Sequence, residues 1–236
     1  TFRLGQRSKC FEGEEAHSLE RALLYCQARE ADLAGNTSPA IIFAREAHLF
    51  DKGFIPASLL LARLEKSDGN KAKASKALEA TWNQAPDKQI AEAYKDLEGG
   101  ERATERLRRI QKLIKKTPLE IESRIQLADQ HIKADHFPEA EVIIEGLLDE
   151  VSLKRVYKLK ADWIRAKGDA GAFEWDTKAE AGEGDALYRC GNCGAHQPSW
   201  KAICSACDEF GSFEYKQSKE IVYNSPSLKA DEPIIR

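Results

Sequence analysis

Short turn signals recur along this chain at a nearly constant interval, and they constrain its fold more than any other feature. They lie 30 to 36 residues apart, at Gly35-Asn36, Gly69-Asn70, Gly99–Glu101, Asp135–Phe137 and Gly168-Asp169. Small residues follow in phase at Ala40, Ala74, Ala140 and Ala172, and prolines close two of the units. A period near 34 residues with a turn in the middle is typical of tetratricopeptide repeats.

The segments between these turns carry apolar residues at helical spacing. One example is Ala57, Leu60, Leu61 and Leu64, and another is Ile121, Ile125, Ala128 and Ile132. A helix–turn–helix unit cannot bury its own apolar face, so stacked units share a continuous core and leave a concave surface. We therefore predict an all-α, tetratricopeptide-type α-solenoid of about four and a half units. A non-repeating helical bundle is the alternative.

Composition agrees with a protein of large surface. Charged residues make up 32% of the 236 residues and the net charge is −3, so the chain is not a polycation and we expect no nucleic-acid partner. No apolar run reaches the length of a membrane helix. The chain begins at Thr1 and has no methionine, which we interpret as truncation at the N-terminus.

Four of the six cysteines form two CxxC pairs near the end of the chain, in "YRCGNCGAHQPSWKAICSACDEF". They are Cys190, Cys193, Cys204 and Cys207, with ten residues between the pairs. Each CxxC turn can aim two thiolates at one point, and two such turns complete a tetrahedral four-sulfur site. We predict these four residues as metal ligands, with His196 an ordinary loop residue.

A shell of four thiolates leaves no position for water or substrate, so the predicted metal is structural. Zinc is favoured, and iron bound as in rubredoxin is the alternative. Disulfides fit less well in a chain that is not a small stapled scaffold. The aromatic residues around the cluster are expected to supply the core or the docking surface of a small knuckle.

These patterns divide the chain into five parts. We expect an N-terminal flank over residues 1–18, helical repeats over 19–179, a hinge over 180–187 and a metal knuckle over 188–216. The last part, 217–236, has no periodicity and is expected to be disordered or laid along a surface. Because an exposed repeat end needs a cap, the knuckle is expected to close the end of the array.

Other features carry less chemistry. The stretch 101–116 has seven basic residues, and Arg102, Arg106, Arg109 and Lys116 share one helical face. We interpret it as a solvated outer face, with a patch for an acidic partner or membrane headgroups as the alternative. The scattered histidines are read as ordinary surface residues, and the chain has no phosphate loop, HExxH or GxSxG motif. We therefore expect a protein that is not an enzyme and has no catalytic residues.

The middle of the chain resembles the tetratricopeptide region of the HemY family. The likeness is carried by "AREAHLFDKGFIPASLLLARL", "KASKALEATWNQAPDKQIAEAYKDL", "ERLRRIQKL", "PLEIESRIQLADQHI" and "KRVYKLKADW". The resemblance implies an inner-membrane protein whose N-terminal membrane helices precede this sequence and whose soluble part is cytoplasmic. It also implies a scaffold for heme-pathway enzymes or other partner proteins.

Parts of the chain also resemble two further families. LapB, a regulator of lipopolysaccharide assembly, is similar in joining a membrane-anchored repeat array to a rubredoxin-like knuckle. The finger of the RadA repair protein resembles the cysteine segment, but this chain lacks the Walker motif of its ATPase. The leading prediction is a non-enzymatic scaffold that grips a protein in its concave face. An iron-binding sensor or electron carrier and a heme-binding protein are the alternatives.

Overall fold

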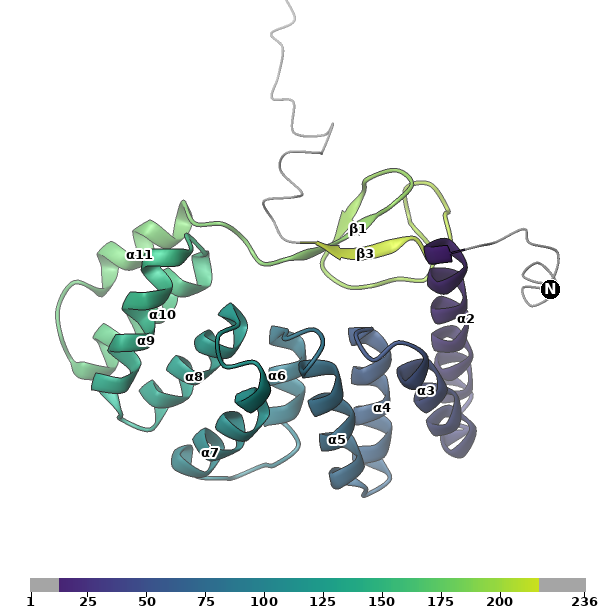
Figure 1. Ribbon diagram of the computed structural model, residues 1–236, viewed down its shortest axis with the longest axis horizontal. Coiled ribbons are helices and arrows are strands. Elements are labelled where there is room, and N and C mark those ends of the chain that lie inside the picture. Colours follow the sequence, from purple (N-terminus) through teal and green to yellow (C-terminus); the bar gives the residue numbers. More distant parts are fainter. Residues whose placement is uncertain (1–12, 217–236) are drawn as a thin grey trace, which may run out of the picture.

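The computed structural model describes residues 13–216, and the predicted tail at 217–236 and most of the predicted flank lie outside this range. Ten α-helices of this range form five antiparallel pairs that follow one another along an arc (Figure 1). The pairs are α2 (Gly13–Leu33) with α3 (Thr37–Phe50), α4 (Ile55–Ser67) with α5 (Lys71–Trp82), α6 (Lys88–Lys95) with α7 (Ala103–Leu113), α8 (Ile121–Lys133) with α9 (Phe137–Glu150), and α10 (Lys154–Lys167) with α11 (Ala172–Glu180). A short 3-10 turn, Ile114–Lys116, extends α7. The predicted fold class, a tetratricopeptide-type α-solenoid, is confirmed.

The turn signals of the sequence lie inside the helix pairs, and their backbone shows why. Gly35, Gly69 and Gly168 have φ values of 75°, 81° and 77°, the left-handed region that glycine enters without steric cost. The next residue's N–H then bonds back to the last turn of the preceding helix, as from Asn36 to the Ala31 carbonyl oxygen at 2.9 Å. This is a Schellman C-cap, and it ends each helix where the next must reverse direction.

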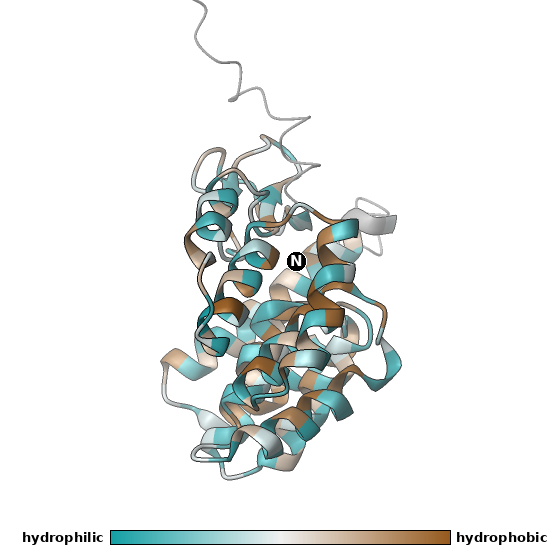
Figure 2. Cartoon of the chain, turned by 90° about the vertical axis from the view of Figure 1, so that its left-hand side faces the viewer, coloured by the Kyte–Doolittle hydropathy of each residue, from teal (hydrophilic) through white to brown (hydrophobic). Residues whose placement is uncertain are grey.

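The core follows the stack of pairs. Ala40, Ala74 and Ala140 are completely buried, whereas Ala172 in the last pair is only half-buried. Figure 2 shows helices that carry apolar residues on one side and polar residues on the other. The largest buried side chain of the middle pairs is Trp82, whose indole N–H donates to Thr117 Oγ1 at 2.8 Å. Burial of small residues at the crossings lets successive helices approach closely.

The C-terminal part is a small antiparallel sheet with strand order β2-β1-β3. Its strands are β1 (Leu187–Cys190), β2 (His196–Gln197) and β3 (Phe213–Lys216). Tyr188 is paired with Gln197 on one side and with Tyr215 on the other. We call residues 188–216 the knuckle and residues 181–187 the linker; the domain boundaries given above, and the mobility of a hinge here, stay predictions.

The knuckle does not cap the last helix pair, which corrects the expectation from the sequence. The linker leads from α11 back across the inner side of the arc, and the knuckle lies over the first helices (Figure 1). Trp200 contacts Tyr25 of α2 and Phe54 at the start of α4, each edge to face with ring centroids 5.1 Å apart. Ser18 Oγ of α2 donates to the Gly211 carbonyl oxygen at 2.6 Å. Trp200 is therefore a docking residue that holds the knuckle on the first helices.

Candidate functional site

The four cysteines come together in the knuckle. Their Sγ atoms all lie within 4.8 Å of one another. Two of the sulfur–sulfur distances are 3.8 Å, for Cys190 and Cys207, and 3.6 Å, for Cys193 and Cys204. A disulfide needs about 2 Å, whereas thiolates about 2.3 Å from a central tetrahedral ion lie roughly 3.8 Å apart. The cluster therefore has the dimensions of a four-sulfur metal site and could bind a metal.

Hydrogen-bond donors surround these sulfurs. The Ser212 hydroxyl lies 3.1 Å from Cys190 Sγ, and the Ala206 N–H donates to Cys204 Sγ at 3.5 Å. Burial alone would raise the pKa of Cys190, but hydrogen bonds from the Cys193 N–H and from Ser212 outweigh it and lower the pKa to about 6. At Cys193 the hydrogen bond from the Ala195 N–H lowers the pKa, but the neighbouring thiols outweigh it and raise the pKa to about 12. The thiolate is the form that binds metal, so binding of an ion releases protons from this cluster. His196 is not a member of the cluster.

A second site lies on the inner side of the arc, where the linker passes the helix N-termini. It is a pocket of about 840 Å³, within the range typical of ligand pockets. Its walls come from the first turns of α6, α8 and α10, from the linker and from the knuckle. The apolar part of the lining includes Ile121, Val151, Leu153, Leu187 and Pro198. We call this the concave pocket.

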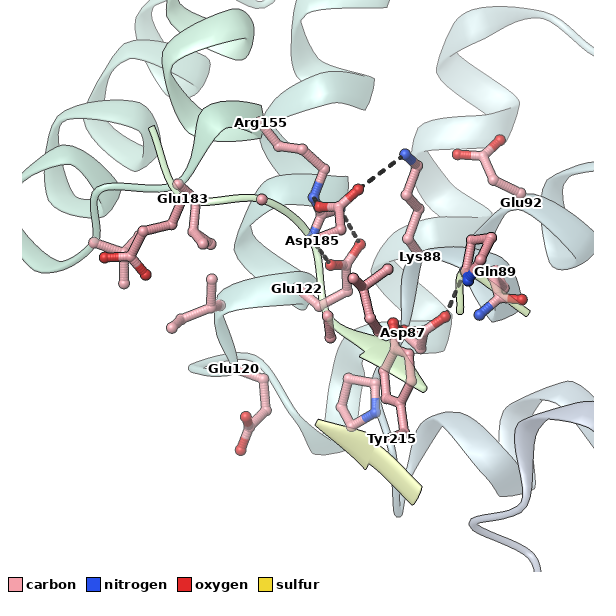
Figure 3. Close-up of a pocket in the computed structure, with 18 residues that line it drawn as sticks. Asp87, Lys88, Gln89, Glu92, Glu120, Glu122, Arg155, Glu183, Asp185 and Tyr215 are labelled. Atoms are coloured by element: carbon pink, nitrogen blue, oxygen red, sulfur yellow. Dashed lines mark hydrogen bonds and ion pairs between the residues drawn. The ribbon is translucent and has the colours of Figure 1, made fainter. Parts of the chain in front are cut away.

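Carboxylates outnumber cations in the concave pocket by six to two (Figure 3). Both cations are engaged: Arg155 bonds Glu122 through two nitrogens, at 3.2 and 2.5 Å, and also pairs with Asp185. Lys88 Nζ lies 3.4 Å from Asp185. Because these pairs leave no cation to spare, the pocket keeps an excess of negative charge.

Asp87 and Tyr215 connect the helical array to the knuckle at the pocket wall. Asp87 is the N-cap of α6, and its Oδ1 accepts from the Gln89 N–H at 2.7 Å. Its Oδ2 accepts from the Tyr215 hydroxyl at 2.6 Å. Burial raises the pKa of Asp87, and the hydrogen bonds from Tyr215 and Gln89 partly offset the rise. The Asp87 carboxylate therefore accepts hydrogen bonds from both the helical array and the knuckle.

The backbone of the linker is paired at Glu183 and again at Leu187, the first residue of β1, but not between them. Glu183 pairs its backbone with the segment before α10: the Lys154 N–H donates to the Glu183 carbonyl at 2.8 Å, and the Glu183 N–H donates to Ser152 at 2.9 Å. A Cβ on Gly182 would lie 2.8 Å from the Lys154 backbone, so only glycine fits this approach. Gly184, Asp185 and Ala186, by contrast, make no backbone–backbone hydrogen bond to another described residue.

The basic face predicted on residues 101–116 is largely paired within the array. Arg106 and Arg109 both pair with Glu101, and the Arg109 guanidinium also stacks on Tyr94 at 4.9 Å from the ring centroid. Lys112 bonds Glu79 of α5 at 3.0 Å. Arg106 and Arg109 are thus paired within their own repeat, and Lys112 is paired with the repeat before it.

The histidines do not converge on one site, although His131 and His136 lie side by side with ring centroids 5.6 Å apart. His131 is buried, not on the surface as expected. Sequence reasoning also missed the concave pocket, because its residues come from six separate segments. One local signal was present: Asp87 follows Pro86 immediately before a helix, the usual position of an N-cap.

Fold and site together define a class: a tetratricopeptide-type solenoid whose C-terminal four-cysteine knuckle folds back on its first helices. No protein-family model matches the chain. A curated relative, the probable magnetosome protein Mms48 of Magnetospirillum gryphiswaldense (strain DSM 6361 / JCM 21280 / NBRC 15271 / MSR-1), is 25% identical over 195 residues. The match covers 81% of this chain and 43% of the relative, so the chain spans less than half of that protein's length.

Among solved structures, the chain is similar to MamA. One MamA structure, described as MSR-1, has a TM-score of 0.38 at 16% identity and covers 69% of this chain and 96% of that one. Another, described as AMB-1, has a TM-score of 0.37 at 18% identity, with 68% and 97% covered. Scores this low do not establish a shared fold, so the fold assignment depends on the helix pairs of the chain itself.

The predicted localisation at the inner membrane, with a cytoplasmic soluble domain, was wrong. It followed from the HemY resemblance alone, whereas the curated relative that matches is a probable magnetosome protein. Across residues 13–216, no helix has both the length and the apolar character needed to cross a membrane.

Proposed function

We propose that this chain is a non-enzymatic protein-interaction scaffold and that partner proteins bind in the concave pocket. The observation that carries the proposal is the pocket itself, which is walled by three successive repeats, the linker and the knuckle. Pockets between repeats of a solenoid present side chains from several units to one extended partner. A partner in this position contacts the array and the knuckle together.

Site-specific photo-crosslinking tests this proposal. A photoreactive amino acid replaces Lys88, which lines the pocket, or Lys76, which is exposed on α5 away from it. We expect defined crosslinked products from position 88 and none from position 76 after irradiation in cells. Products from position 76 alone would place the binding surface on the other side of the array.

We also propose that Cys190, Cys193, Cys204 and Cys207 hold one structural zinc ion. The sulfur–sulfur distances of 3.6 and 3.8 Å support a tetrahedral ion of zinc–thiolate dimensions. Zinc would cross-link two loops of a unit too small to have much core of its own. Metal analysis of purified protein should find one zinc per chain. One iron per chain with visible thiolate charge-transfer bands would support the alternative, a rubredoxin-like centre.

The likeness to Mms48 favours a scaffold at the magnetosome, which predicts that a fluorescent fusion expressed in Magnetospirillum gryphiswaldense aligns with the magnetosomes. A diffuse signal would contradict it. The links to heme biosynthesis through HemY and to lipopolysaccharide assembly through LapB stay predictions from resemblance.

A further inference from the structure

We infer that the concave pocket binds an extended, lysine- or arginine-bearing segment of a partner protein, an inference that rests on the scaffold function proposed above. The charge balance of the pocket is the first support. Six carboxylates line it, and its two cations are already paired with Glu122 and Asp185. A segment with basic side chains is complementary to this lining, whereas an acidic segment would be repelled.

Four of the six carboxylates are not paired with Arg155, and two of these four are open to a ligand. Glu92 and Glu120 are on opposite sides of the pocket in Figure 3. Glu120 is exposed and makes no ion pair with another described residue. Glu92 is half exposed, and its one ion pair among the described residues is with Lys95 of its own helix, at 2.7 Å. Both can therefore meet a ligand cation without breaking the pairs that hold the linker.

The backbone of the linker indicates that the ligand is a peptide. Gly184, Asp185 and Ala186 line the pocket, and their backbone groups are not bonded to the backbone of other described residues. They continue directly into β1, and no described strand lies beside them in the pocket. An extended peptide can pair with such an edge through its main chain while its side chains reach the walls.

The lining of the pocket is complementary to a peptide in which apolar and basic side chains alternate. Apolar side chains, Ile121, Val151, Leu153 and Leu187, form part of the lining next to the carboxylates. Alternate side chains of an extended peptide point to opposite faces. One face of the ligand can therefore bury apolar groups while the other carries its cations to Glu92 and Glu120.

The test uses the full chain and two fluorescein-labelled heptapeptides, one that alternates lysine with valine and one in which glutamate replaces each lysine. Fluorescence anisotropy should show saturable binding of the lysine peptide only. The E92Q/E120Q variant should bind about five- to tenfold more weakly. The control variant E141Q/D149N, which removes two exposed carboxylates of α9, should bind as the unaltered chain does. N-methylation of alternate backbone amides of the lysine peptide should also weaken binding.

Several results would overturn the inference: no saturable binding of the lysine peptide, equal binding of both peptides, or equal losses in the two variants. Full displacement by an equal concentration of spermine would assign the pocket to a small polycation. Tighter binding of a synthetic peptide of residues 217–236 would assign it to the chain's own C-terminal residues. If these probes fail while position 88 still yields crosslinks, the scaffold function stands and only the ligand chemistry is wrong.

Discussion

The hydroxyl of Tyr215 donates a 2.6 Å hydrogen bond to Oδ2 of Asp87, a residue 128 positions earlier in the chain. The bond joins β3 of the knuckle to the N-cap of α6 in the middle of the array. Asp87 is only 6% exposed, so water is a poor substitute for a lost donor. The knuckle is thereby fastened to two places, the first helices and the centre of the arc.

Removing that hydroxyl should destabilise the protein measurably. Y215F leaves a buried carboxylate oxygen without its donor, which costs about 1–3 kcal/mol in the free energy of unfolding. Because the Tyr215 bond lowers the pKa of Asp87, the pKa should rise further in the variant. Urea denaturation and an NMR titration of the Asp87 carboxyl measure the two effects. Y157F is the control, since the Tyr157 hydroxyl makes no hydrogen bond with another described residue. An equal loss of stability in Y157F would contradict the assignment.

A matched pair of glycines tests the contact between the knuckle and α2. Gly211 and Gly194 have φ values of 71° and 75°, so alanine at either position adopts a left-handed conformation that costs about 1–2 kcal/mol. A Cβ on Gly211 would also lie 3.2 Å from the Ala22 Cβ in α2, whereas a Cβ on Gly194 meets nothing nearer than 3.8 Å. G211A should therefore lose about 1–3 kcal/mol more stability than G194A. It should also speed amide hydrogen exchange in α2, and unchanged exchange would show that the knuckle is not docked there.

Much of this fold could be predicted because its determinants are local. Gly35, Gly69 and Gly168 end helices through left-handed C-caps, and a C-cap leaves a sequence signal at the residue that makes it. The cysteine cluster was equally predictable, since two CxxC turns bring four sulfurs together once the strands pair. Both features depend on residues that are close together in the sequence.

The docking of the knuckle and the concave pocket could not be predicted in the same way. Trp200 packs on Phe54 and Tyr25 across more than 140 residues, and a single aromatic residue carries no sign of its partner. The sequence suggested a cap on the nearest repeats because it gives no measure of how far the linker reaches. Arg155, Glu122 and Asp185 likewise meet only after the arc has formed.

Buried His131 and its half-buried neighbour His136 should make stability depend on pH. Burial and the neighbouring His136 lower the pKa of His131 below its ordinary 6.5. A histidine with a depressed pKa in the folded state contributes stability above 6.5 that is lost as pH falls through the folded-state pKa. H136Q removes the repulsion between the rings, so an NMR titration should find a higher pKa for His131. A pKa that is unchanged or lower in H136Q would rule out this coupling.

Metal removal should melt the knuckle and leave most of the helices folded. C190A breaks the four-sulfur cluster, and the knuckle then loses the cross-link between its loops. Far-ultraviolet circular dichroism should retain most of its helical signal, because the helix pairs bury their own core away from the knuckle. Hydrogen exchange should nevertheless rise around Phe54 and Tyr25, which lose their contacts with Trp200. Loss of most of the helical signal would mean that the array depends on the metal for folding.

A second pair of glycines tests how the linker is placed over the concave pocket. G182A puts a methyl group 2.8 Å from the backbone of Lys154, a contact that only a shift of the linker can relieve. G184A, two residues further on, meets nothing within 4 Å. The shift should break the two backbone bonds of Glu183, so the amides of Lys154 and Glu183 should exchange faster in G182A than in G184A.

The same substitution should also affect peptide binding, because Asp185 lies on the same linker. G182A should loosen the pairing of Asp185 with Arg155 and weaken binding of the lysine peptide, whereas G184A should bind the peptide as the unaltered chain does. Faster exchange in G182A with full peptide affinity would show that the fixed position of the linker is not needed for binding.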